Sequence, residues 1–354
     1  MKRDFYPDGC QQGFTLIEIM VAMLLGLFLL GGGLQVVTHS KTTYRTQEAL
    51  SRMQENARFA MDFLAKEIRM AGFIGCGNQD ALTNTLNTPT AFLYNFGTAI
   101  EGFESSSATA WTPSINNLAI PSPLPSALPG SDIITVRRVD NQGFTVPTHV
   151  TATDGLTLDA TATTANLKSA GFLTSTATNN CATAVVTDCS TAAVFQVSGV
   201  AGTVLAHATG GACTLQNATD DLGKTYANGQ VYPINTISYY VRKKPGYQPG
   251  LYRKKGREDA EELIEGIEKM QILYGVDTDI TADGTANYYV TADKVLVPDW
   301  RKVVSVRISL LLVSLDDNLT DKPVSYTYNG VQEPGDRHLR KVFTSTIALR
   351  NRLS

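Results

Sequence analysis

The clearest feature of the hydrophobic pattern is one long apolar run near the N-terminus. From Phe14 to Thr38 the chain is almost entirely apolar, and Glu18 is its single charged residue. The run is long enough to cross a bilayer, which needs roughly 20 apolar residues. Because Lys2 and Arg3 precede it, we expect residues 1–13 to stay on the cytoplasmic side and the rest of the chain to lie beyond the membrane.

After the apolar run, the pattern becomes that of an amphipathic helix over residues 39–71. We predict one continuous helix from Phe14 to Ala71, ended by Gly72, Gly75 and Gly77, with residues 31–33, all glycine, as the place where it could bend or melt. The alternative is a membrane helix followed by a separate core helix. Apolar residues recur at intervals of three and four, and charged residues lie off this stripe. The stripe is Leu50, Met53, Ala57, Ala60, Leu64 and Ile68, and the charged residues off it are Arg52, Glu55, Arg58, Asp62, Glu67 and Arg69.

Beyond residue 77 the pattern is mostly that of β-strands. A short charged helical turn is expected at residues 258–265, and the last two strands are expected to form a hairpin across a polar loop at residues 316–337. Alternating or β-branched runs bounded by Gly, Pro and Asn predict the strands. They lie at residues 132–139, 193–198, 230–242, 267–276, 301–314 and 341–351.

These elements predict an α+β fold, in which an antiparallel sheet packs on the exposed half of the N-terminal helix. A Thr/Ser-rich insertion interrupts the strands. The expected organisation has five parts: a cleaved leader, a transmembrane half-helix, an amphipathic half-helix, a loop-rich β insertion with the first strands, and a C-terminal sheet region. Their ranges are 1–13, 14–38, 39–71, 72–225 and 226–354.

Glu18 needs an explanation that hydropathy does not supply. A carboxylate in a membrane segment costs on the order of 2.5–3.5 kcal/mol on insertion scales, so it should have a partner. A plain signal anchor would leave Glu18 unexplained. A secretory signal peptide is disfavoured because the apolar run is long and no small-x-small cleavage site follows it.

The segment Gly13-Phe14-Thr15-Leu16-Ile17-Glu18, with the apolar run after it, resembles the class III processing motif of type IV prepilins and type II secretion pseudopilins. The resemblance implies cleavage by prepilin peptidase after Gly13 and N-methylation of the new terminal Phe14. It also implies a role in assembly for Glu18, because the terminal amine of a neighbouring subunit can neutralise its carboxylate.

Blocks further along the chain are similar to PilW-type minor pilins. The similarity implies a low-abundance subunit that primes assembly with other minor pilins and the major pilin on the inner-membrane platform. It also implies a place near the pilus tip at the cell surface, where the subunit would support a large adhesin. The rival family is the J-type minor pseudopilin of type II secretion, for which the chain is long. The similar blocks are residues 40–76, 188–199, 262–279, 300–314 and 344–353.

The composition predicts an ordinary folded core, and the net charge bears on whether the chain binds nucleic acid. A chain with 43% apolar and 18% charged residues can form an ordinary core. The net charge of −3 argues against direct binding of nucleic acid through phosphate neutralisation. Two short basic runs, Arg242-Lys243-Lys244 and Arg253-Lys254-Lys255, are interpreted as solvated strand ends, with a polyanion site as the alternative.

Four cysteines remain once Cys10 is removed with the leader, and an even number beyond the membrane favours two disulfides over free thiols. Four cysteines allow three pairings. Pairing Cys181 with Cys189 is disfavoured, because the extended run between them would separate their Cα atoms by about 26 Å. Of the two pairings left open, we favour Cys76–Cys189 with Cys181–Cys213.

We expect no enzyme and no cofactor. The four histidines have no metal-ligand spacing, and the chain has no phosphate loop, no G-x-S-x-G elbow and no C-x-x-C. Asp277, Asp279 and Asp283 form a weak calcium candidate, since alternating carboxylates suit a hard cation. Ala282 stands where the sharp-turn glycine belongs, and no glutamate follows at the twelfth position, so a polar β-turn is favoured.

Overall fold

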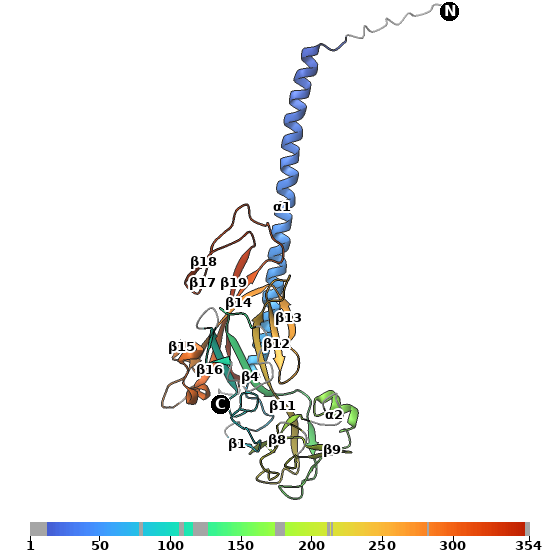
Figure 1. The fold of residues 1–354 in the computed structure, drawn as a ribbon, viewed down its shortest axis with the longest axis vertical. Coiled ribbons are helices and arrows are strands. Elements are labelled where there is room, and N and C mark those ends of the chain that lie inside the picture. The colour runs from blue at the N-terminus through green and yellow to red at the C-terminus, as the bar shows by residue number, and fades with distance from the viewer. Residues whose placement is uncertain are drawn as a thin grey trace, which may run out of the picture.

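The long helix is the dominant element of the computed structural model (Figure 1). The described residues are 13–77, 81–105, 110–115, 127–173, 181–210, 213, 215–281 and 283–350. The leader residues up to 12, including Lys2, Arg3 and Cys10, lie outside them, as do Ala282 and position 351. Helix α1 (Leu16–Arg69) is continuous over 54 residues. The alternative of two separate helices is therefore wrong.

The glycines at 31–33 do not break α1. Open space surrounds each of the three, because nothing lies within 4 Å of a Cβ built on them. The expected bend or melting rested on the low helix propensity of glycine. The helical ladder on both sides holds these residues in the helix.

The membrane-distal half of α1 packs through the predicted stripe. Met53, Ala57, Ala60, Leu64 and Ile68 are buried, and the predicted stripe is confirmed there. Ala49 replaces Leu50 as the first buried residue, since Leu50 remains half-buried. These side chains join one core with the inner faces of the C-terminal strands.

The C-terminal sheet has four strands in the order β15-β14-β16-β19. The predicted hairpin is confirmed, because β16 pairs antiparallel with β19 from Ser305↔Ala348 to Val313↔Arg340. The loop between them contains a small hairpin of its own, β17 with β18. Bounds in this region are β14 (Ile267–Val276), β15 (Tyr288–Val290), η3 (Ala292–Lys294), η4 (Val297–Lys302), β16 (Val303–Val313), β17 (Tyr326–Tyr328), β18 (Val331–Glu333) and β19 (Arg340–Ala348).

A second, larger sheet has ten strands and is organised around the long strand β11 (Gly229–Arg242). Its central order is β1-β8-β7-β11-β4-β2-β3, with β12, β13 and β5 branching from this path. The other bounds are β1 (Leu82–Asn84), β2 (Ile100–Ser105), β3 (Trp111–Thr112), β4 (Ile133–Val139), β5 (Phe144–Val146), β7 (Thr183–Thr187), β8 (Ala192–Gln196), β12 (Gly250–Lys255) and β13 (Glu261–Glu265).

Two expectations about the strands are wrong. Residues 261–265 form strand β13, paired antiparallel with β12, instead of a helical turn. The carboxylates of Glu261 and Glu262 meet Arg253 and Lys244, so cross-strand ion pairs replace the local helical contacts. The body also contains several sheets in place of one, and β1 pairs with β8 in parallel.

The Thr/Ser-rich region forms a lobe at the end of the molecule farthest from the N-terminus (Figure 1). It contains a three-stranded sheet, the short helix α2 and a separate hydrophobic core. The added elements are β6 (Leu156–Thr157), α2 (Thr164–Ala170), β9 (Gly199–Ala201) and β10 (Val204–Ala206). The fold as a whole is α+β, as predicted.

Candidate functional site

The N-terminal segment begins with extended backbone and turns helical at Leu16. Thr15 is the N-cap of α1 and forms a reciprocal capping box with Glu18. The Thr15 N–H and hydroxyl each donate to Glu18 Oε2 at 3.0 Å, and the Glu18 N–H donates to Thr15 Oγ1 at 3.3 Å. Gly13 and Phe14 precede the helix, and Phe14 is 83% exposed. The expected cleavage site therefore lies on accessible, non-helical backbone.

The apolar half of α1 has no packing partner among the described residues. By length and composition α1 can cross a membrane, and none of its apolar window is buried in the protein. The large side chains from Phe14 to Val37 are exposed. Contiguous apolar surface of this size needs lipid or other protein around it. Glu18 lies on this surface with Thr15 as its partner within the chain.

Glu67, expected on the solvent side of α1, is instead buried at 5% exposure. The Arg138 guanidinium of β4 donates to both of its carboxylate oxygens, at 2.8 and 3.0 Å. Burial and the nearby Glu67 charge raise the pKa of Tyr239 above its ordinary value. A helix wheel cannot reveal this pair, since Arg138 lies 71 residues away in the sequence. The pair fixes the end of α1 on the large sheet.

The four cysteines form two disulfides. Cys76 bonds to Cys189 and Cys181 bonds to Cys213, which are the pairs favoured from the sequence. The first joins the segment just after α1 to the turn between β7 and β8. The second joins the start of β7 to the segment after β10. Both bonds therefore hold the distal lobe.

The predicted calcium residues come together in the connection between β14 and β15. Candidate ligand atoms of Asp277, Asp279 and Asp283 lie within 4.8 Å of one another. Asp277 is buried and already accepts three backbone N–H groups, from Asp279 at 3.0 Å, Asp283 at 3.1 Å and Gly284 at 2.9 Å. This geometry favours the polar-turn interpretation, and calcium binding stays the weaker, untested alternative.

A buried acid pair that the sequence analysis missed connects the two large sheets. Asp132 is 3% exposed and accepts the N–H groups of Ser105 at 2.9 Å and Ile272 at 2.8 Å. The Gln271 amide bridges Asp132 and Glu104. Burial, followed by the neighbouring Glu104 charge, raises the pKa of Asp132 to about 8. Asp132 was assigned simply to the start of a strand, so nothing in its local pattern indicated this contact.

One group of residues has the composition of a catalytic triad but not its arrangement. His338 Nδ1 lies 3.3 Å from Ser314 Oγ, and its Nε2 lies 3.8 Å from Asp317. Ser314 is buried, its hydroxyl donates to the Asp316 carbonyl, and it accepts from the Leu339 N–H. A nucleophile must be accessible and hydrogen-bonded to its base. These residues instead organise the turn after β16.

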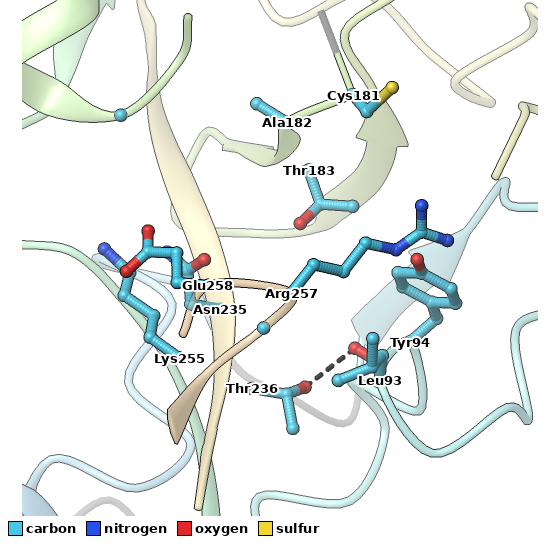
Figure 2. Close-up of a pocket in the computed structure, with 12 residues that line it drawn as sticks. Leu93, Tyr94, Cys181, Ala182, Thr183, Asn235, Thr236, Lys255, Arg257 and Glu258 are labelled. Atoms are coloured by element: carbon cyan, nitrogen blue, oxygen red, sulfur yellow. Dashed lines mark hydrogen bonds between the residues drawn. The ribbon is translucent and has the colours of Figure 1, made fainter. Parts of the chain in front are cut away.

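A cavity of about 300 Å³ lies where the distal lobe meets β11 and β12 (Figure 2). Arg257 extends across it toward Tyr94, and Lys255 and Glu258 lie on the opposite side. Lys255 is paired with Asp140 at 2.8 Å, and Lys254 donates to the Glu258 carbonyl. Arg253 and Lys255 are thus each paired with a carboxylate, Arg253 with that of Glu261, which argues against a polyanion site at the run 253–255.

Two family models match this chain, one near each of its ends. Residues 238–351 match the family model described as Type IV Pilus-assembly protein W (PilW), and residues 9–34 match the prokaryotic N-terminal methylation motif. The pilin-like protein PilA3 of Thermus thermophilus is 31% identical over 72 residues. That alignment covers 20% of this chain, and the chain spans about a third (31%) of the length of PilA3.

Among solved structures, a type IV-like pilin from Thermus thermophilus aligns with a TM-score of 0.30 and 11% identity. The alignment covers 86% of this chain and 98% of the other. The methylation motif spans the segment that carries Gly13, Phe14 and Glu18, and the PilW match spans the end of β11 and the strands from β12 to β19. The chain therefore carries a prokaryotic N-terminal methylation motif at one end and a region similar to the PilW family at the other.

Proposed function

We propose that this chain is a minor subunit of a type IV pilus, cut after Gly13 by prepilin peptidase and methylated on Phe14. It crosses the inner membrane once, with the leader in the cytoplasm and the body outside it. It then enters the pilus, where it primes assembly with other minor pilins and the major pilin on the inner-membrane platform. A position near the tip, beneath an adhesin, follows from the PilW-type resemblance.

The observation that carries the proposal is Glu18 on an otherwise apolar, exposed half-helix. Thr15 supplies the carboxylate with hydrogen bonds but with no positive charge. An ionised carboxylate in a low-dielectric medium is stabilised strongly by a nearby cation. The new terminal amine of an adjacent subunit is such a cation, and assembly is the event that brings it close. The proposal assigns no catalytic role and no cofactor to the chain.

Glu18→Ala tests the proposal, with Glu55→Ala as the matched control because Glu55 is exposed on the water-side half of the same helix. We expect Glu18→Ala to be processed and to reach the membrane fraction, yet to fall at least tenfold in sheared pili. Glu55→Ala should be incorporated normally. Intact mass reports loss of residues 1–13, and Gly13→Leu provides the uncut reference.

Equal incorporation of the two variants contradicts the role of Glu18. Deletion of the gene, with surface pili and protein secretion measured in parallel, separates the pilus from the pseudopilus. Loss of pili with secretion intact supports the proposal, and loss of secretion with normal pili selects the J-type pseudopilin.

A further inference from the structure

Strand β19 leaves one whole edge of the C-terminal sheet open. It is the last strand in the order β15-β14-β16-β19 and pairs with β16 without a register shift. The Leu349 N–H bonds the Val304 carbonyl, and the Ser314 N–H bonds the Leu339 carbonyl. In an antiparallel ladder, residues alternate between facing the partner strand and facing away from it. Odd-numbered residues of β19 therefore bond β16.

The even-numbered residues of β19 direct their backbone N–H and C=O groups away from β16. Among the described parts of the chain, none of these backbone groups has a hydrogen-bond partner. Most of the strand is exposed along this edge, and Val342 is 42% exposed. The open edge consists of Arg340, Val342, Thr344, Thr346 and Ala348.

Within the described chain no proline, bulge or covering element blocks this edge, and its charged residues, Arg340 and Lys341, lie at one end of the strand. Natural edge strands are blunted by proline, bulges, inward charges or a covering element. β19 has no proline and no bulge, and helix α1 packs on its inner face through Phe343 and Ile347. The hairpin of β17 and β18 pairs with itself. A regular edge of this length is a template for an added strand.

We propose that β19 receives an extended segment from another pilin-class subunit of the same filament, which adds a fifth strand to this sheet. Figure 1 shows β19 beside α1, the element that would enter the filament under the proposed function, so neighbouring subunits would come close to this strand. This inference rests on the proposed function. The middle of the edge is uncharged, whereas Lys341 and Arg350 at its two ends are exposed. The donor segment should therefore be β-branched in its centre and acidic at its flanks.

Charge argues against a second copy of β19 as the donor. Antiparallel self-pairing brings Lys341 of one copy toward Arg350 of the other at both ends of the ladder. Parallel self-pairing places each cation beside its own equivalent. Like charges on neighbouring strands are destabilising, so a different, acidic strand fits better.

Thr344→Pro tests the open edge, with Thr344→Val as the matched control. The Thr344 N–H points away from β16, so proline removes an outward donor and leaves the β16 ladder intact. Both variants lose the hydroxyl contact to Ser309 at 2.9 Å equally. We expect about tenfold less Thr344→Pro than Thr344→Val in sheared pili, because one strand-to-strand bond is lost and its acceptor is left unpaired. Thr346→Pro should behave like Thr344→Pro.

Folding is checked on the full-length variants in detergent, by melting temperature and by the non-reduced mass that reports both disulfides. If the proline variants do not fold, a photo-reactive benzophenone residue at Ala348 in the otherwise unchanged chain provides the test. The matched position is Val150 in the distal lobe, which is 73% exposed. We expect an adduct with a pilin-class subunit from position 348 and none from position 150.

Equal incorporation of folded Thr344→Pro and Thr344→Val overturns the inference and leaves the proposed function standing. The same holds if position 348 gives no adduct with a pilin-class subunit. An adduct of position 348 with a second copy of this chain also overturns it. Absence of the unsubstituted chain from pili overturns the proposed function and, with it, the inference.

Discussion

The two halves of α1 share one backbone and use it in opposite ways. From Leu16 to Val37 its large apolar side chains are exposed, whereas from Ala49 to Ile68 its apolar stripe is buried under the sheets. Each half also carries one distinctive glutamate. Glu18 is exposed and bonded to Thr15, whereas Glu67 is buried and bonded by the Arg138 guanidinium. The second half therefore buries its apolar side chains and pairs its glutamate within the chain. The first half can do neither within the chain and depends on lipid or on other subunits.

Glu67→Ala should have the largest effect on stability, because it removes the closer carboxylate of the largely buried Arg138 and leaves that charge with only the Asp140 carboxylate, at 3.9 Å. We expect a loss on the order of 3–5 kcal/mol, seen as a lower melting temperature of the full chain in detergent. Glu55→Ala, an exposed position on the same helix, should change little. If the two variants have the same melting temperature, the buried pair does not hold α1 on the sheet.

Leu64→Ala and Leu24→Ala make the same substitution in the two halves. Leu64 is fully buried, so its loss should cost about 2–5 kcal/mol through lost burial and a cavity. Leu24 is mostly exposed in the chain alone, so Leu24→Ala should have the same melting temperature as the unsubstituted protein. A similar loss from both would mean that the apolar half packs on the body after all.

Glu104→Gln should have the smallest effect and extends the comparison to a carboxylate buried beside another acid. The pKa of Asp132 is raised above its unfolded value, so the folded state holds an extra proton between the ordinary carboxyl range and about pH 8. Stability is then fully present at acidic pH and is lost as the pH rises through the raised pKa. At about 1.4 kcal/mol per pH unit, the decline from pH 5 to pH 8 is on the order of 4 kcal/mol. Glu104→Gln should remove only the smaller part of it that comes from the Glu104 charge, because burial is the larger cause.

Glu104→Gln removes the repelling charge and should flatten this decline, measured as melting temperature against pH. Asp293, which also bears on Glu104, is left in place. The histidines are unchanged in the variant, so the difference between the two profiles isolates the acid pair. Parallel profiles would contradict the assigned cause.

The sequence was most informative where local pattern decides the structure. The helix from Leu16, the stripe from Met53 to Ile68 and the strand at 267–276 follow from periodicity, and the structure has them. The sequence was least informative where the burial or secondary structure of a residue depends on a partner far away in the chain. Glu67 became a core residue because of Arg138, and residues 261–265 became a strand because β12 lies beside them. The Asp132 contact to β14 belongs to the same class, since it joins residues about 140 positions apart.

The bond between Cys76 and Cys189 has a mechanical consequence. It closes a loop across 113 positions, and its first cysteine follows the end of α1 by seven residues. A filament under tension pulls on its subunits through their helices. Force that reaches the end of α1 can pass through this covalent bond directly into the distal lobe, bypassing the strands β1 to β7 that lie between the two cysteines in the chain. The lobe farthest from the membrane would therefore stay attached even if those intervening strands were pulled apart.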